Sequence, residues 1–196
     1  MADGVAPIGR GRHDDAARII TEALLHDPGW LAVGPDRTEH RRFIARLYHR
    51  AALRVIDRHG GPIYGAFRGG RLAGVAATFA AGLYPPPART FFAYVPSFAL
   101  AGPGAIVRGL RTTTVQDGGH PKEPHVFLWF LAVDPGRQRS GVGRELLGKV
   151  FEDAEAPVYL DTSNPDNLPY YSSFGFQQIG CGDIPRDAKM WFMRRP

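Results

Sequence analysis

The residues of this sequence whose types and spacing best support chemistry form a glycine-bearing loop, Gln138–Gly143, flanked by Arg137 and Arg144. A continuously apolar segment, 126–133, precedes the loop, and a helical pattern follows it. Glycines let backbone N–H groups turn into one concavity, and a helix start adds unpaired N–H groups and a positive dipole end. The loop therefore predicts a phosphate-binding site. It is not a nucleotide P-loop, because the Gly-Lys-Ser/Thr ending is missing, and its glycines lack the dinucleotide spacing.

Two glycines also suit a plain connection between a strand and a helix, but this loop resembles a known pattern. It matches Gln/Arg-x-x-Gly-x-Gly/Ala, the acetyl-CoA pyrophosphate loop of the GCN5-related N-acetyltransferase (GNAT) family, at every specified position. The later segment 167–176 resembles the family motif in which a tyrosine lies four residues before Gly-Phe, and that tyrosine is Tyr171. The chain is thus identified as a GNAT member that uses acetyl-CoA as cosubstrate and no metal. Residues 120–196 are most similar to the puromycin-type N-acetyltransferases of the family, whereas residues 1–119 match mainly in layout.

The resemblance implies a role for each matching residue. The backbone near a bulge in the central strand would contact the acetyl carbonyl and pantetheine. Tyr171 would protonate the departing thiolate as general acid, because the pKa of a phenol, about 10, is close to that of a thiol; Tyr170 is the alternative. Asn167 or Asn164 would bind pantetheine, unless each serves only to cap a helix. The implied coenzyme-binding residues are Leu131, Ala132, Val133, Gln138, Arg139, Ser140, Gly141, Val142, Gly143, Arg144, Asn167 and Tyr171.

The general base is the least defined role in this sequence. Many family members place a glutamate on the central strand, but 127–131 contains no acid. Glu123 and His125 come just before that strand, together with His120, and Asp161 ends the next expected strand. A histidine titrates near neutrality and could act directly or through water. Each of these residues also suits a structural role, and a water relay to solvent is the competing explanation.

Aromatic residues are concentrated in the half that is expected to bind the acceptor. An aromatic or bulky apolar amine suits a pocket built from such residues, although core packing accounts for them equally well. The sequence favours a small-molecule primary amine as acceptor. A protein lysine or N-terminus is the alternative acceptor, and a non-catalytic acyl-CoA-binding sensor is the alternative class of protein. The aromatic residues are Trp30, Tyr84, Phe91, Phe92, Tyr94 and Phe98.

Periodicity and turn signals predict the elements that position these motifs. Strands are expected at 5–8, 62–67, 71–80, 126–133, 157–161, 176–180 and 189–194. Helices are expected at about 14–26, 36–59 and 141–154, within 164–174, and across 90–117 as one or two segments. Asp14 or Asp15 is expected to cap the first helix, Asp27 with the next two residues to end it, and Asp36 with Glu39 to form a capping box for the second.

The expected helix 36–59 carries two opposed stripes. Its apolar stripe should face the core. On the other side, arginines repeat every four residues, and such like-charge pairs repel by a few tenths of a kcal/mol each. We interpret this arginine stripe as a solvated face rather than an anion-contacting or nucleic-acid surface. The apolar stripe is Phe43, Leu47, Ala51 and Val55, and the arginine stripe is Arg42, Arg46, Arg50, Arg54 and Arg58.

The order of elements together with the resemblance predicts the fold. We expect one α/β (α+β) domain over residues 1–196, with a mixed twisted sheet of six or seven strands and helices on both faces. The sheet should splay between its central strands where the coenzyme enters. Residues 1–119 should form mainly the acceptor side and residues 120–196 the acetyl-CoA side.

Composition limits the kinds of site, the location and the partners that this protein can have. The chain has 196 residues, a formal charge of +5, 44% hydrophobic residues and one cysteine, Cys181, which excludes an internal disulfide and a multi-cysteine metal site. The N-terminus has no export pattern, and Pro96 with Gly102 to Gly104 would break the uncharged stretch 90–107 as a membrane span. We expect a cytoplasmic protein without nucleic-acid or membrane partners, and the sequence is compatible with a homodimer.

Overall fold

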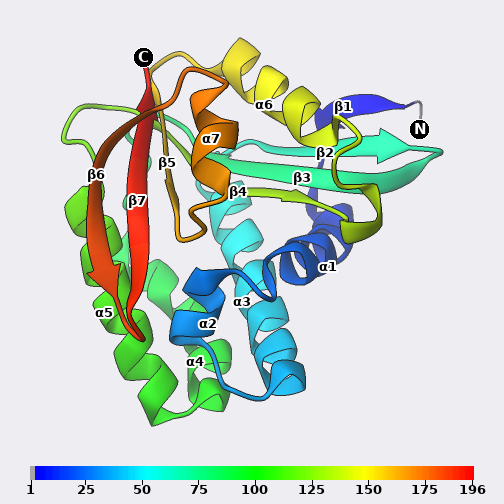
Figure 1. Ribbon diagram of the computed structural model, residues 1–196. Coiled ribbons are helices and arrows are strands. Elements are labelled where there is room, and N and C mark those ends of the chain that lie inside the picture. Colours follow the sequence, from blue (N-terminus) through cyan, green and yellow to red (C-terminus); the bar gives the residue numbers. More distant parts are fainter. Residues whose placement is uncertain (1–2) are drawn as a thin grey trace.

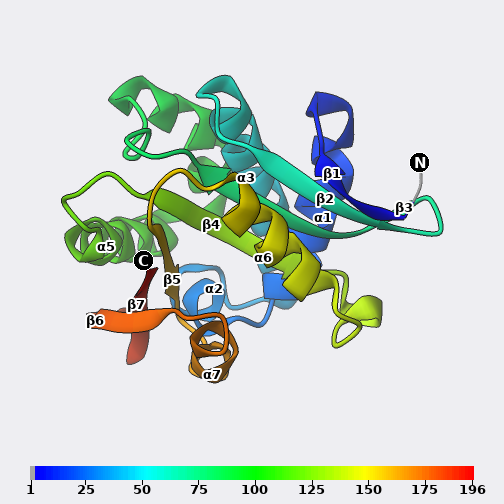
Figure 2. The same cartoon turned by 90° about the horizontal axis from the view of Figure 1, so that it is seen from above.

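The computed structural model describes residues 3–196, which form one mixed α/β domain (Figure 1). Its seven strands make a single sheet in the order β1-β2-β3-β4-β5-β7-β6. Helix α6 (Val142–Asp153) covers one face, and α1 (His13–Leu24) and α3 (Thr38–Arg58) cover the other (Figure 2). The predicted mixed sheet with helices on both faces is confirmed.

The first four strands of the sheet are antiparallel neighbours: β1 (Gly4–Pro7), β2 (Ile63–Arg68), β3 (Arg71–Phe79) and β4 (Val126–Val133). The turn between β2 and β3 places both of its glycines, Gly69 and Gly70, at positive φ, 57° and 72°. Two consecutive residues of this kind match the right-handed twist of a hairpin, and glycine adopts them without steric cost. The predicted hairpin is confirmed.

The central strand β4 contains a bulge at Trp129. Residue Ala77 of β3 pairs with Phe130, but the next residue, Thr78, pairs with Leu128, so that Trp129 is the extra residue. Trp129 and Phe130 stack with their ring centroids 5.0 Å apart. Side chains of successive strand residues normally point to opposite faces, so this stacking follows from the bulge.

β4 and β5 (Val158–Thr162) separate soon after they meet. Within residues 3–196 these parallel strands pair only at Val126 with Val158 and at Phe127 with Tyr159. β5 then pairs with β7 (Ala188–Arg195), and β6 (Gln177–Ile184) forms the outer edge. In Figure 1, these three strands run across the direction of β1 to β4. The predicted splay between the central strands is confirmed.

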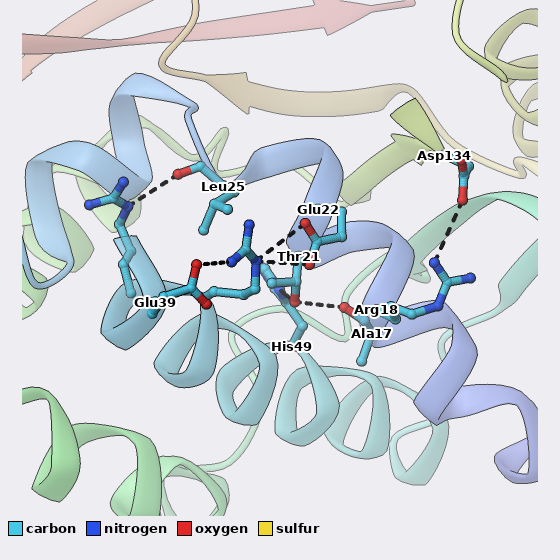
Figure 3. Close-up of polar contacts among 10 residues, drawn as sticks. Ala17, Arg18, Thr21, Glu22, Leu25, Glu39, His49 and Asp134 are labelled. Carbon is cyan, nitrogen blue, oxygen red and sulfur yellow. Dashed lines mark hydrogen bonds and ion pairs between the residues drawn. The ribbon is translucent and has the colours of Figure 1, made fainter. Parts of the chain in front are cut away.

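Polar contacts join α1 to α3 and to the sheet (Figure 3). The Thr21 hydroxyl donates to the carbonyl of Ala17 at 2.7 Å, so it accepts from Nδ1 of His49 at 2.9 Å. Burial lowers the pKa of His49 to about 3, which keeps the imidazole neutral. Arg18 of α1 forms an ion pair with Asp134, directly after β4, at 3.6 Å. These contacts fix α1 and α3 against the end of β4 that opens toward β5.

Helix α3 buries a somewhat different stripe from the predicted one. Ala51 and Val55 are buried as expected, but Phe43 is 53% exposed and its neighbour Ile44 is buried instead. The arginine stripe lies toward solvent, and two of its five members form ion pairs within the described residues. Arg42 pairs with Glu22 and Glu39, and Arg50 pairs with Asp14.

The residues between α1 and α3 form a short helix, α2 (Pro28–Val33), that was not predicted. Asp27 begins this helix rather than ending α1, because its side chain accepts from the N–H of Gly29 at 2.9 Å. Proline at the first helical position has no N–H to satisfy and suits this start. The signal that was interpreted as a helix end is therefore a helix start.

The other predicted caps are also wrong. Helix α1 begins after Arg12, with Asp14 and Asp15 inside its first turn, where acids still favour the positive helix end. Helix α3 begins after Arg37, and Asp36 pairs with Arg186 at 2.7 Å instead of forming a capping box.

A buried arginine holds the turn between α2 and α3. The Arg41 guanidinium donates to the carbonyls of Leu25, Pro35 and Asp36 at 3.2, 2.9 and 3.0 Å. Buried carbonyls need such partners, so Arg41 fixes the path of the chain that surrounds α2.

Two helical segments follow the hairpin, as predicted: α4 (Val95–Ala101) and α5 (Pro103–Gly119), separated by Gly102 at φ 87°. A short helix, α7 (Asn167–Ser172), precedes β6. Three 3₁₀ turns complete the described chain, at Arg10–Arg12, Ala88–Tyr94 and Pro135–Arg137. Helix α5 packs against β6, β7 and α2, and α4 packs against α3 and α5. This helical layer closes one side of the gap that β4 and β5 leave open.

Candidate active site

The splayed part of β4 presents unpaired backbone groups to the gap. The N–H of Asp134 donates to the carbonyl of Ala73 in β3 at 2.9 Å. Backbone groups of successive strand residues alternate between the two edges, so Ala132 also uses its N–H and C=O toward β3, while Leu131 and Val133 point theirs toward β5. Because β5 has already diverged, these groups of Leu131 and Val133 can bind an extended ligand as a further strand would.

The glycine-bearing loop has the backbone geometry of an anion-binding concavity. Arg139 has φ 61° and Gly141 has φ 86°, both in the left-handed region, directly before α6 begins at Val142. Ser140 is tied back by its hydroxyl, which donates to the carbonyl of Arg137 at 2.5 Å. The side chains of Gln138, Arg139 and Ser140 are exposed. The loop therefore offers N–H groups, a helix start and arginine side chains at one place.

Helix α7 lies against the start of α6. A Cβ atom at Gly143 would be 2.7 Å from the hydroxyl oxygen of Tyr170, so glycine permits this approach. The Arg144 guanidinium lies 5.0 Å from the ring centroid of Phe174, just after α7. The loop, α6 and α7 thus border one entrance to the gap.

A cavity of about 230 Å³ lies on the side of the gap covered by α2, α3, α4 and α5. Residues of β4 and β5 form its floor, and side chains of the helices form its walls. Its aromatic lining is provided by Trp30, Tyr48, Phe98, Trp129, Phe130 and Tyr171. Its polar lining is provided by Asp27, Ser97, Thr112, Thr113, Gln116, Asp161, Thr162, Ser163 and Asn167.

Tyr171 lies between the gap and this cavity. It is only 8% exposed, and no hydrogen bond to its hydroxyl is formed within residues 3–196. Burial raises the pKa of Tyr171, and the nearby Tyr170, Asp27 and Asp161 raise it further. The phenol therefore stays protonated at neutral pH and is able to donate. Asn167 lines the cavity one helical turn earlier and donates to the hydroxyl of Thr162 at 3.2 Å, whereas Asn164 caps the turn at Asp166 outside the cavity.

Two carboxylates line the cavity near Tyr171. Asp161, on β5, accepts from Nε2 of Gln116 of α5 at 2.9 Å. Burial raises the pKa of Asp161 to about 6; the Gln116 hydrogen bond lowers it, and Asp27 and Asp117 raise it. Burial likewise raises the pKa of Asp27, against the hydrogen bond from Gly29. Asp161 is therefore a group that changes charge just below neutral pH.

The structure does not bring Glu123 and His125 to the cavity. His125 is buried beside the start of β4, where its Nδ1 donates to the carbonyl of Glu123 at 2.8 Å and its Nε2 lies 3.1 Å from Nδ1 of His120. The Glu123 side chain is exposed. This cluster lies at the end of β4 that pairs with β5, and it packs on Tyr84 and Tyr159. Among the four candidates for the general base, Asp161 alone lines the cavity.

The predicted aromatic residues occupy four kinds of position. Trp30 and Phe98 line the cavity, and Tyr94 packs behind Tyr48 with ring centroids 5.0 Å apart. Phe91 and Phe92 are exposed, and Tyr84 stacks on His120 away from the cavity. Sequence reasoning missed Tyr48, Trp129 and Asp27 as lining residues. Tyr48 lies next to the predicted apolar stripe of α3. This position in the sequence indicates that its side chain faces the sheet, and so it could have been identified.

Comparison with known proteins establishes the family. Residues 25–176 match the acetyltransferase (GNAT) family, and the chain belongs to it. This is the family that the loop and Tyr171 motifs indicated. A 65-residue segment is 37% identical to an uncharacterized protein of Mycobacterium leprae; it spans 32% of this chain but only 18% of that relative's length.

Solved structures share the fold at low sequence identity. A histone acetyltransferase HPA2 and related acetyltransferase from Corynebacterium glutamicum superposes with a TM-score of 0.70 at 20% identity, over 100% of this chain and 97% of the other. The C-terminal condensation domain of Ebony, in complex with beta-alanyl-dopamine, gives 0.67 at 10% identity over 100% and 99%. A Salmonella typhimurium protein with its cofactor acetyl-CoA gives 0.57 at 16% identity over 99% and 93%.

In residues 3–196, no group of three or more histidine, cysteine, aspartate or glutamate side chains is arranged to hold a metal ion. None of the helices described is both long and apolar enough to cross a membrane.

Proposed function

We propose that this protein is an N-acetyltransferase that transfers the acetyl group of acetyl-CoA to a primary amine of a small molecule. The observation that carries this proposal is the position of Tyr171, a protonated phenol without a protein partner between the strand gap and an aromatic cavity. Acetyl-CoA supplies an acyl carbon activated as a thioester. The protein binds the two reactants next to each other and provides Tyr171 as a proton donor between them.

The residues on the coenzyme side fit this cosubstrate. The backbone groups of Leu131 and Val133 suit pantetheine and the acetyl carbonyl. Ala132 directs its backbone groups to β3 and is therefore not assigned to coenzyme binding. The loop N–H groups and the arginines suit the pyrophosphate. Asn167 and Tyr171 border the same gap. The residues that we assign to acetyl-CoA binding are Leu131, Val133, Gln138, Arg139, Ser140, Gly141, Val142, Gly143, Arg144, Asn167 and Tyr171.

Tyr171 is the proposed general acid. Its hydroxyl gives a proton to the sulfur as the amine displaces it. Burial and, to a smaller extent, the nearby Tyr170, Asp27 and Asp161 disfavour the phenolate, so the group is held in the donating form over the physiological range. Tyr170, the alternative, is directed to Gly143 and the start of α6 rather than to the cavity.

The helices that line the cavity favour a small-molecule acceptor over a protein. Helices α2, α4 and α5 surround the space that faces Tyr171, and α2 is held by Arg41 and by the Arg186 ion pair of Asp36. A protein lysine or N-terminus needs an open groove. The amine-derived ligand of the Ebony domain supports an amine with an aromatic body.

Two measurements test the proposal. Isothermal titration calorimetry should show acetyl-CoA binding, and a thiol-release assay should show turnover with small primary amines, aminonucleosides such as puromycin included, but not with lysine peptides. Tyr171→Phe should lower kcat by about 10²- to 10⁴-fold, the usual contribution of a positioned acid. Tyr64→Phe is the matched control, because Tyr64 is equally buried but bonds to Asp153 on the other face. Acetyl-CoA binding without turnover on any amine would support an acyl-CoA sensor instead.

A further inference from the structure

Asp27 and Asp161 come from distant parts of the chain but line the same cavity. Asp27 lies between α1 and α2, and Asp161 lies near the end of β5. The two segments touch, because a Cβ atom at Gly29 would lie 3.1 Å from Oδ1 of Asp27 and 3.0 Å from the hydroxyl of Ser163. Each carboxylate has one protein donor, the Gly29 N–H for Asp27 and the Gln116 amide for Asp161.

Neither carboxylate has a cationic partner. Within residues 3–196, no lysine or arginine forms an ion pair with Asp27 or Asp161, although arginine is abundant in the chain and pairs with many other acids. The titratable groups close enough to Asp161 for their charges to interact with it are acidic or phenolic: Asp27, Asp117 of α5, Tyr48 of α3, Tyr84, Tyr159 of β5 and Tyr171 of α7. Two carboxylates that are partly removed from water repel each other, and a bound cation relieves the cost.

One further observation in the cavity indicates a ligand. The Tyr171 side chain lines the cavity and is more than nine-tenths buried, and its hydroxyl has no partner in the described chain. Polar groups with so little access to water are normally hydrogen-bonded, so an unpaired hydroxyl that lines the cavity beside an acidic pair points to a polar head that enters this end.

Aromatic side chains surround the same space. Trp30 meets the ring of Tyr48 edge-on at 5.4 Å, and Tyr48 meets Trp129 edge-on at 6.3 Å. Aromatic walls favour both an apolar body and, through their faces, a cation. The described cavity therefore combines negative charge at one end with an aromatic body site.

We propose that Asp27 and Asp161 bind the ammonium group of an arylalkylamine or a comparably bulky apolar monoamine, and that Asp161 accepts the proton that the amine loses before acetyl transfer. The inference rests on the proposed function and assigns its acceptor class and its base. Asp161 is the catalytic residue of the pair, and Asp27 is the residue that holds the charge.

The proton transfers balance as follows in the site. One ammonium proton passes to the carboxylate of Asp161, which is a stronger base than an ordinary aspartate because burial raises its pKa. As the nitrogen–carbon bond forms and the carbon–sulfur bond breaks, the Tyr171 hydroxyl gives its proton to sulfur. The second nitrogen proton restores the phenol. Asp161 then releases its proton to solvent, so that one proton is released for each amide formed.

The first test measures amine binding in the absence of acetyl-CoA. Calorimetry with 2-phenylethylamine should show binding at millimolar concentration, with clearly weaker binding of 2-phenylethanol, which lacks the charge. Asp161→Asn and Asp27→Asn should each weaken the binding of 2-phenylethylamine by about tenfold or more, because each removes one partner of a desolvated charge pair. Asp183→Asn is the control, because its side chain is 83% exposed on β6 and should leave affinity unchanged.

The pH dependence of the wild-type protein tests the same point without a substitution. Because the pKa of Asp161 is about 6, affinity for 2-phenylethylamine should fall by about tenfold from pH 7.5 to pH 5, as the carboxylate takes up a proton. The Asp161→Asn protein should lose most of this dependence. Binding that is undetectable, equal for the alcohol and the amine, or unaffected by both substitutions overturns the proposal.

The outcomes distinguish failure of the proposed acceptor site from failure of the proposed acetyltransferase activity. Turnover of amines that is insensitive to both aspartates would leave the acetyltransferase in place and remove the acceptor site. Amine binding with the expected pH dependence but no acetyl-CoA binding would keep the acceptor site and remove the acetyltransferase.

Discussion

Replacing Asp161 with asparagine should stabilise the protein while it impairs amine binding. The pKa of this carboxyl rises from the ordinary 3.8 to about 6 in the folded protein. At about 1.4 kcal/mol for each tenfold change in proton affinity, ionisation costs the folded state about 3 kcal/mol. Asparagine keeps an oxygen that accepts from Gln116 but carries no charge. We therefore expect Asp161→Asn to raise the free energy of unfolding at pH 7.5 by up to about 3 kcal/mol.

The same rise in the pKa of Asp161 determines how the stability difference between the variant and the wild type changes with pH. A raised pKa means that the folded state binds the proton more tightly, so the cost is absent below pH 3.8, develops between pH 3.8 and about 6, and is complete above that. The difference between the variant and the wild type should therefore grow from pH 4.5 to pH 7.5. Urea unfolding at both values measures it, with an unchanged denaturant slope as the check on two-state behaviour. A gain that is the same at both pH values, or a loss at pH 7.5, refutes the assignment of Asp161 as an uncompensated carboxylate.

Three other substitutions test separate parts of the structure. Gly143→Ala puts a methyl group 2.7 Å from the Tyr170 hydroxyl and should weaken acetyl-CoA binding in calorimetry, with recovery in the Gly143→Ala, Tyr170→Phe double variant; no recovery would mean that Tyr170 does not border the coenzyme path. Gln116→Leu removes the hydrogen bond that lowers the pKa of Asp161, so the acidic limb of the kcat/KM profile should move to higher pH; an unmoved limb would exclude Asp161 as the base. Arg41→Met leaves buried carbonyls without donors and should cost about 2–5 kcal/mol in urea unfolding, whereas a neutral result would show that water replaces the guanidinium.

Local signals explain which elements could be predicted from the sequence. The hairpin at Gly69-Gly70 follows from two residues that tolerate positive φ, and β4 follows from an uninterrupted apolar run. The loop before α6 and the Tyr171 segment were recognisable because both depend on backbone geometry that needs particular residues at fixed spacing. These features predict that the coenzyme side lies in the second half of the chain.

The bulge at Trp129 could not be predicted, because both faces of β4 are buried and no alternation marks the extra residue. Asp27 was interpreted as a helix end because Asp-Pro-Gly is a turn signal, yet the same aspartate and proline also suit a helix start. His125 and Glu123 are close to β4 in sequence, but they lie at the end of the strand that pairs with β5, whereas the proposed chemistry takes place at the other end. Closeness to β4 in the sequence therefore does not reveal which end of β4 separates from β5.

The electrostatics of the proposed acceptor site also account for product release. A cationic amine is attracted by Asp27 and Asp161, but its acetylated product is neutral and gains nothing from the two carboxylates. N-acetyl-2-phenylethylamine should therefore bind at least about tenfold more weakly than 2-phenylethylamine at pH 7.5, although it is larger and buries more apolar surface. Competition calorimetry against the free amine measures the ratio. Equal or tighter binding of the amide would show that the aromatic walls, and not the acidic pair, dominate recognition of the acceptor.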